Sequence, residues 1–119
     1  MTISIIVPCF NEEESLPLFY AEMEKIKSQI DDNFEYIFVN DGSKDRTIEL
    51  IKEYREKDKR VCYVDFARNF GKETAMKAGI DYATGDAVVF LDADLQDPPE
   101  IITEMIKYWE EGYDDVYAQ

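Results

Sequence analysis

Short apolar runs alternate with segments of helical periodicity along the whole chain, and this alternation constrains the fold more strongly than any other feature. Runs such as ISIIVP are continuously apolar, as in strands that are covered on both faces. Between the runs, apolar residues recur three and four positions apart, as on one face of a helix. Strands that alternate with helices form a mostly parallel sheet, because right-handed crossovers return each strand to the same direction.

These patterns predict a three-layer α/β/α architecture with a mostly parallel, Rossmann-like sheet, in one domain over residues 1–119. The predicted strands are 3–8, 34–39, 61–66 and 87–91. The predicted helices are 16–30, 44–57 and 71–83, followed by a helix between Asp97 and Gly112 and a strand at 115–118. Ser43 is the expected N-cap of the second helix, and Gly85 is expected just past the end of the third.

The charge of the chain excludes several classes of function. It has 27 acidic and 13 basic side chains, a net charge of −14, and no histidine. Repulsion excludes nucleic acid and anionic lipid surfaces as partners of this segment. The lack of histidine excludes Ser-His-Asp and Cys-His catalysis and histidine-bound zinc. An anionic nucleotide would need a local cation, such as a metal ion, to bind here.

The cysteines and the N-terminus indicate a cytoplasmic location. Cys9 and Cys62 are expected to be free, buried thiols in a reducing compartment, because their spacing fits neither a redox pair nor a zinc site. The first apolar run lacks a preceding basic segment, so it is typical of a strand and not of a signal peptide. No stretch approaches the roughly 18 apolar residues of a membrane span, and we expect no membrane contact from this segment.

Polar residues follow each predicted strand, at the edge of an open α/β sheet where ligands bind. Asp92 and Asp94 follow the fourth strand, and on an extended chain they would face the same side with Cα atoms about 6.5 Å apart. Oxygen ligands of this kind select Mg²⁺ or Mn²⁺, which also take phosphate oxygens. A solvated loop explains an isolated Asp-x-Asp equally well, but its place directly after an apolar strand favours a metal site.

Other polar residues at this edge have two interpretations each. Asp41 accepts hydrogen bonds from a ribose or a base, or it is only a turn residue in Asn-Asp-Gly. Glu12 caps the first helix or faces a nucleotide. Arg68 and Lys72 contact phosphates, or they form a solvated pair in a charged loop.

Four segments carry a resemblance to a known family. They are VPCFNEEESLP, NDGSKDRT, ARNFGKETAMKAG and TGDAVVFLDADLQDPPEI, which cover nearly the whole chain in this order. Together they resemble the nucleotide-sugar-binding half of the family-2 glycosyltransferases, which have the GT-A fold. RNFGKE and DADLQDPPE are most similar to bacterial polyprenyl-phosphate glycosyltransferases, relatives of dolichyl-phosphate mannose synthase.

The resemblance implies transfer of a sugar, with inversion, from a nucleotide diphosphate to a lipid-linked phosphate such as a polyprenyl phosphate. A UDP-sugar is the expected donor, and Mg²⁺ or Mn²⁺ the expected cofactor. The implied nucleotide-sugar-binding residues are Pro8, Phe10, Glu12, Asp41, Arg68, Lys72, Asp92, Ala93 and Gln96. The implied metal ligands are Asp94, as the main one, and Asp92.

The chain departs from the pattern of the family in two ways. Asn40 stands where many relatives have aspartate, so one nucleoside contact is expected to be neutral. The general base of the family is expected beyond residue 119, together with the acceptor-binding half. The chain alone is therefore expected to be inactive, and the sheet edge left exposed by the missing half is expected to favour a homo-oligomer.

Two other classes of function compete with this one. A phosphotransferase of the haloacid-dehalogenase type also uses an Asp-x-Asp after a strand, but there the first strand carries it and here the fourth does. A nucleotide-binding or interaction module that keeps the fold without the chemistry stays open, because a fold does not determine function.

Overall fold

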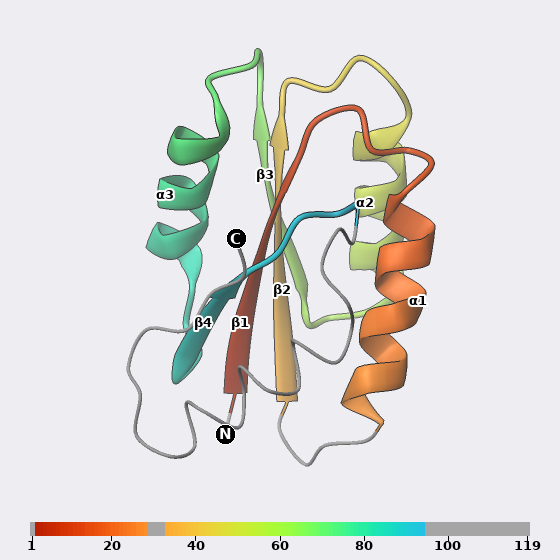
Figure 1. Ribbon diagram of the computed structural model, residues 1–119, viewed down its shortest axis with the longest axis vertical. Coiled ribbons are helices and arrows are strands. Elements are labelled where there is room, and N and C mark those ends of the chain that lie inside the picture. Colours follow the sequence, from red (N-terminus) through yellow and green to blue (C-terminus); the bar gives the residue numbers. More distant parts are fainter. Residues whose placement is uncertain (1, 29–32, 95–119) are drawn as a thin grey trace.

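A parallel sheet with helices on both faces forms the frame of the molecule (Figure 1). The computed structural model describes residues 2–28 and 33–94. The strands are β1 (Thr2–Cys9), β2 (Asn33–Asp41), β3 (Val61–Phe66) and β4 (Ala87–Phe90). The helices are α1 (Leu16–Lys27), α2 (Thr47–Lys57) and α3 (Lys72–Tyr82).

The strands of the described sheet lie in the order β3-β2-β1-β4, and all three pairs are parallel. β1 pairs with β2 from Thr2, opposite Asn33, to Cys9, opposite Asn40. On its other side, β1 pairs with β4 along a shorter register that ends with Ile6 opposite Phe90. β1 is therefore an inner strand, and the carboxyl ends of all four strands meet at one edge.

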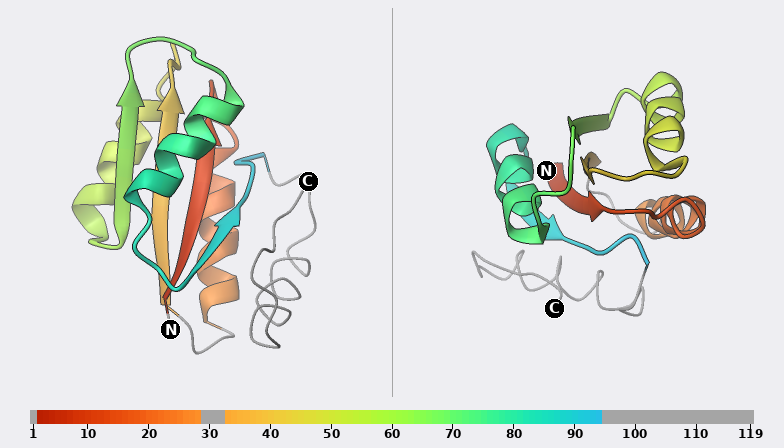
Figure 2. Two further views of the ribbon diagram at one scale, coloured as in Figure 1. Left: turned by 90° about the vertical axis from the view of Figure 1, so that its left-hand side faces the viewer. Right: turned by 90° about the horizontal axis from the view of Figure 1, so that it is seen from above.

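The two faces of the sheet have separate cores. Helices α1 and α2 lie on one face and α3 on the other, which confirms the predicted three-layer architecture (Figure 2). Ile5 of β1 packs with the α1 and α2 side, whereas the next residue, Ile6, packs with Ala75 of α3. Successive side chains of a strand point to opposite faces, so burial on both faces explains why the strand sequences are continuously apolar.

The predicted N-cap of the second helix is wrong. Helix α2 begins at Thr47, its N-cap residue is Arg46, and the N–H of Thr47 donates to the side chain of Asp45 at 2.9 Å. The Ser43 hydroxyl accepts a hydrogen bond from the backbone N–H of Asn11 instead, at 2.9 Å. The Ser43 hydroxyl oxygen therefore joins the loop before α2 to the loop after β1, and it does not cap α2.

The role predicted for Gly85 is also wrong. Helix α3 ends at Tyr82, and the only glycines with positive φ among the described residues are Gly42 and Gly71. Gly85 is needed for a close approach, because a Cβ there would lie 2.6 Å from Oγ of Ser4. Its N–H donates to the same hydroxyl at 2.8 Å, which ties the start of β4 to β1.

Some predictions lie outside the described residues, namely the fourth helix, the fifth strand and the last part of the first helix around Ile30. Both cysteines are free, with Cys9 buried and Cys62 half-buried. Each helix in residues 2–28 and 33–94 is too short or too polar to cross a lipid bilayer.

Helix α3 packs closely against β1 because Gly79 has no side chain. A Cβ on Gly79 would lie 2.3 Å from Cγ2 of Ile6, which is fully buried in the sheet. The helix interior would otherwise favour alanine over glycine by about 0.5–1 kcal/mol. The glycine therefore sets the distance between α3 and the strand at the centre of the sheet.

We expect Gly79→Ala to lower the free energy of unfolding by about 1–3 kcal/mol, because overpacking at Ile6 outweighs the gain in helix propensity. The measurement is urea unfolding followed by circular dichroism. Lys77→Ala, at an exposed position of the same helix, is the control and should change stability by no more than about 0.5 kcal/mol. A Gly79→Ala variant as stable as the parent chain would contradict the close packing.

Candidate functional site

A pocket lies where the chain reverses its direction of travel across the sheet. From β1 the chain moves outward to β3 and then crosses to the other side of β1 to form β4. In open α/β sheets, ligands bind outside the carboxyl ends of the strands at such a switch point. The pocket here has a volume of about 150 Å³. Its lining residues are Pro8, Cys9, Phe10, Glu12, Asp41, Lys72 and Asp92.

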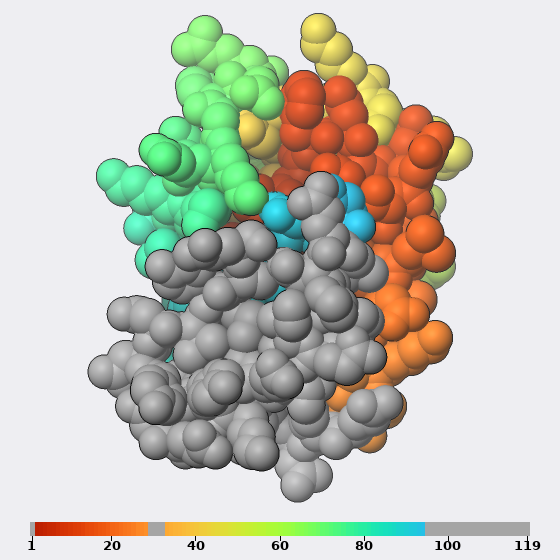
Figure 3. All heavy atoms as spheres, viewed as in Figure 1, coloured from red at the N-terminus to blue at the C-terminus, as the bar shows by residue number. Residues whose placement is uncertain are grey.

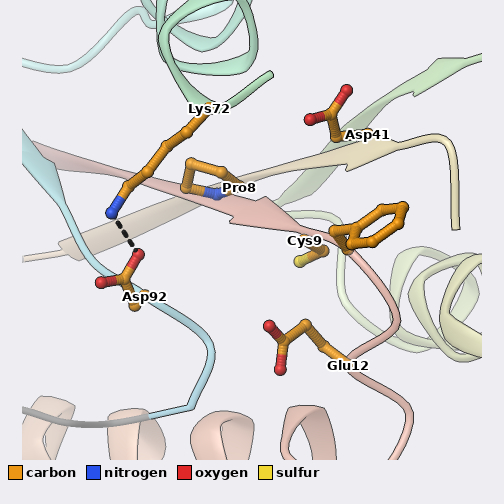
Figure 4. A pocket seen from close by; sticks show the side chains of 7 residues that line it. Pro8, Cys9, Glu12, Asp41, Lys72 and Asp92 are labelled. Carbon is orange, nitrogen blue, oxygen red and sulfur yellow. Dashed lines mark ion pairs between the residues drawn. The ribbon is translucent and has the colours of Figure 1, made fainter. Parts of the chain in front are cut away.

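Three parts of the chain that are distant in sequence adjoin one another at this point. Figure 3 shows atoms of β1 and its following loop in red, of the α3 region in green and of the segment after β4 in blue, meeting on one face. In the close view, Lys72 extends toward Asp92, and Asp41 lies at the end of its strand beyond Pro8 (Figure 4). The parallel sheet therefore brings together six of the predicted site residues, namely Pro8, Phe10, Glu12, Asp41, Lys72 and Asp92.

Hydrogen bonds to the loop after β2 hold the loop after β1 in place. Asn11 has a φ of 53°, a left-handed conformation that a non-glycine residue adopts rarely. Its side-chain oxygen accepts from the N–H of Lys44 at 2.8 Å, while its own N–H binds Ser43. The N–H of Glu12 donates to the buried Thr47 hydroxyl, also at 2.8 Å. These bonds fix the two residues beside Asn11, Phe10 and Glu12, at the pocket.

The pocket has an acidic end. Burial raises the pKa of the Glu12 carboxyl; a hydrogen bond from Ser15 opposes this, and the charges of Asp94 and Asp92 raise the pKa further. The Glu12 carboxylate points toward the Asp92 side of the pocket (Figure 4). Three carboxylates that repel one another in this way create a local negative potential that a cation would relieve.

Asp92 and Asp94 are not on an extended strand, and this part of the prediction is wrong. β4 ends at Phe90, and residues 93–94 form a turn. The main chain of Leu91 still bonds to Ile6 of β1, at 3.0 Å, but the chain then bends. As a result Asp92 lines the pocket, while Asp94 is exposed outside its lining. The metal-ligand roles of both residues stay predictions.

A lysine ammonium occupies the position of a cation at this acidic end. Nζ of Lys72 lies 2.8 Å from Oδ1 of Asp92. Both side chains are well exposed, so the pair contributes little to stability. No three acidic or cysteine side chains gather into a metal cage within the part of the chain described by the structure. The pocket carboxylates of Glu12 and Asp92 are oxygen ligands of the kind that Mg²⁺ or Mn²⁺ accepts, and such an ion takes few carboxylates when phosphate and water oxygens complete its shell.

Asp41 makes contacts that neither sequence interpretation included. It is the last residue of β2, is only 4% exposed, and accepts the N–H of Phe70 at 2.7 Å and of Gly71 at 3.1 Å. Asp41 thus lines the pocket, and both oxygens of its carboxylate bind the loop before α3. Because that loop lies about thirty residues further along, local sequence contained no indication of these bonds.

Asn40, where the resemblance led us to expect an aspartate in many relatives, is not among the residues that line the pocket. It is buried, and its side-chain N–H donates to Oδ1 of Asp65 at 2.8 Å. An aspartate here would bring a second carboxylate against Asp65. The amide therefore fits this chain because its neighbour on β3 is acidic.

The remaining predicted residues that the structure describes do not line the pocket. The Arg68 guanidinium is 4.8 Å from the centre of the Phe70 ring and does not line the pocket. Ala93 is buried and also absent from the lining, and Gln96 lies outside the described residues. Their roles stay predictions.

Sequence analysis missed Cys9 as a lining residue. Its position at the end of β1, between the two predicted site residues Pro8 and Phe10, could have identified it. Burial is the main reason that the pKa of the Cys9 thiol lies well above its ordinary value, so the thiol is neutral and unreactive. Cys9 therefore contributes shape, and not a nucleophile, to the pocket.

Comparison with curated proteins gives relatives that are much longer than this chain. An uncharacterized glycosyltransferase, YkcC of Bacillus subtilis (strain 168), is 53% identical over 115 residues, which are 97% of this chain and 36% of that protein. The bactoprenol glucosyl transferase of Shigella phage SfX is 46% identical over 119 residues, which are 100% of this chain and 39% of that protein. The chain thus spans little more than a third of the length of these relatives.

Solved structures have the same fold. A mannosyltransferase from Pyrobaculum calidifontis, in complex with GDP-Man and Mn²⁺, superposes with a TM-score of 0.68 at 26% identity, over 89% of this chain and 31% of that one. S. aureus TarS 1–349, in complex with UDP-GlcNAc, gives a TM-score of 0.67 at 26% identity, over 89% of this chain and 32% of that one. These similarities confirm a GT-A-like fold.

The match to a family model covers far more than half of the chain. The model described as glycosyl transferase family 2 matches residues 4–119. The matched segment contains all seven residues that line the pocket. This chain belongs to glycosyl transferase family 2.

Proposed function

We propose that the pocket is the donor-nucleotide site of an inverting glycosyltransferase that moves a sugar from a UDP-sugar to a polyprenyl phosphate. The observation that carries the proposal is the composition of the pocket at the switch point. An exposed aromatic ring, Phe10, lies at one part of it, and the Lys72–Asp92 pair lies at another. A nucleoside diphosphate needs the same two elements, an apolar surface for the base and a charged end for the phosphates.

At the phosphate end of the pocket, one basic side chain and one acidic side chain are proposed to bind the diphosphate and its metal ion. Among the described residues that line the pocket, Lys72 is the basic one, so it is the proposed protein contact of the diphosphate. Asp92, with Asp94 next to the pocket, is the proposed holder of Mg²⁺ or Mn²⁺. Such an ion would neutralise charge on the leaving diphosphate. The Mn²⁺ in the complex of the Pyrobaculum mannosyltransferase supports this part of the proposal.

The nucleoside end is proposed to use Phe10 and Pro8. The Phe10 ring is 45% exposed, which is unusual for a phenylalanine on a loop that is otherwise fixed by hydrogen bonds. The flat ring offers a stacking surface for a base. UDP and UDP-GlcNAc complexes of S. aureus TarS favour uridine as that base.

The acceptor is proposed from relatives alone. Bactoprenol glucosyl transferases match this chain over its whole length, which supports a polyprenyl-phosphate acceptor at the cytoplasmic face of a membrane. This chain spans only 39% of the length of the relative from Shigella phage SfX. Nucleotide binding, and not turnover, is therefore the property by which the proposal is tested on this chain.

We expect UDP to bind this chain in a Mn²⁺-dependent manner, as measured by calorimetric titration with and without the ion. Asp92→Asn should weaken the binding in Mn²⁺ by about tenfold or more, because a charged contact to the ion is lost. It should also reduce the gain in affinity that Mn²⁺ provides.

Asp81→Asn is the matched control, since Asp81 is exposed on α3 and the substitution changes the net charge equally. It should bind UDP as the parent chain does. Binding of UDP that is indifferent to Mn²⁺ and to Asp92→Asn would contradict the metal site. Failure of the folded chain to bind either UDP or GDP would contradict the donor-site proposal.

We expect Phe10→Ala to weaken UDP binding by about 5- to 150-fold, the equivalent of about 1–3 kcal/mol for one base stacked on an aromatic ring. The same variant should bind inorganic pyrophosphate with unchanged affinity, because pyrophosphate has no base. Tyr82→Ala, an equally drastic change at a ring that is 62% exposed on α3, is the control. An equal loss for UDP and pyrophosphate would show that Phe10 acts on the fold of the pocket and not on the base.

A further inference from the structure

The carboxylate of Asp41 accepts the two backbone N–H groups just before α3, those of Phe70 and of the N-cap residue Gly71. Gly71 is the N-cap residue of α3, has a φ of 102°, and makes no side-chain cap. The first N–H groups of a helix have no partner within the helix. Asp41 accepts the N–H of Gly71 and of the residue before it, and its negative charge also suits the positive end of the helix dipole.

The end of β2 holds the same loop by two further contacts. The side-chain N–H of Asn69 donates to the backbone oxygen of Asp41 at 3.2 Å. The next residue, Gly42, lies directly against the loop, because a Cβ there would lie 2.3 Å from the backbone nitrogen of Asn69. The position of residues 69–71 is thus determined by the end of β2 rather than by their own sequence.

Lys72 is the first residue of α3, directly after the two amides that Asp41 binds. Its ammonium reaches the other side of the pocket, where it pairs with Asp92 (Figure 4). A chain of contacts therefore runs from Asp41 through the backbone of Gly71 to Lys72. Asp41 itself is nearly fully buried, so little of its surface is left for a ligand.

We propose that Asp41 is a positioning residue for the phosphate end of the pocket, where it fixes the N-terminus of α3 so that Lys72 meets a diphosphate. This positioning role goes beyond the nucleoside contact that the resemblance implies for Asp41. It rests on the proposed function, because it takes the ligand to be a nucleoside diphosphate. The two roles differ in what a probe without a nucleoside would detect. Inorganic pyrophosphate is such a probe, because it retains only the phosphate groups.

The first test needs no ligand. In Asp41→Asn, the amide group keeps one acceptor oxygen but turns an N–H₂ group toward a backbone N–H, so one hydrogen bond is lost. We expect the amides of Phe70 and Gly71 to exchange with solvent about tenfold faster, as followed by NMR. Asp81→Asn, with the same change in net charge, should leave their exchange unchanged. Unchanged exchange in Asp41→Asn would overturn the proposal.

The second test compares ligands in the presence of Mn²⁺. Asp41→Asn should weaken the binding of pyrophosphate and of UDP by a similar factor, about tenfold, because both ligands lose their contact with the positioned Lys72 ammonium. In a Lys72→Met background, Asp41→Asn should cause no further loss for pyrophosphate, since the group that it positions is absent. A loss for UDP with unchanged pyrophosphate affinity would assign Asp41 to the nucleoside alone and overturn the proposal.

A milder variant covers the case in which Asp41→Asn does not fold. Asn69→Ala removes only the bond to the backbone oxygen of Asp41. It should speed the exchange of the Phe70 and Gly71 amides about threefold and weaken the binding of pyrophosphate about threefold. A parent chain that binds neither probe would contradict the proposed function. Faster amide exchange at Phe70 and Gly71 in Asp41→Asn would in that case still establish that Asp41 fixes the loop before α3. Failure of the proposed function and failure of the positioning role are therefore distinguishable.

Discussion

The parallel pairing of β1 on both of its sides is the constraint on which the rest of the structure depends. β2 and β4 flank β1, and its side chains are buried against α1 on one face and α3 on the other. Because the strands are parallel, each contributes its following loop to the same edge. Residues separated by more than eighty positions, such as Pro8 and Asp92, therefore meet in one pocket.

The loops at this edge are ordered by one another rather than by their own sequences. The loop after β1 depends on hydrogen bonds to the loop after β2, through Asn11, Ser43 and Thr47. The loop after β3 depends in turn on Asp41 at the end of β2. The end of β2 and the segment that follows it, as far as Thr47, thus support both flanks of the pocket.

The sequence allowed the architecture to be predicted because burial on both faces imposes a largely apolar pattern on an inner strand such as β1. The third strand, 61–66, agrees to the residue with β3. Predictions failed where long-range contacts override local chemistry, as for the hydroxyl of Ser43 and for Gly85, which is small because Ser4 lies against it. Most lining residues could be predicted because they follow strands, but the bonds of Asp41 to a distant loop could not.

The ion pair between Lys72 and Asp92 bears on how so acidic a chain can admit an anion. In the proposed complex, the Lys72 ammonium would pair with a phosphate of the ligand. The Asp92 carboxylate would pair with a divalent ion that binds together with that ligand. Such an exchange of partners conserves the number of opposite-charge contacts, so the diphosphate and the ion together would change the charge of the pocket much less than the diphosphate alone. The net charge of −14 would then act mainly on the approach of the ligand, and much less on its residence in the pocket.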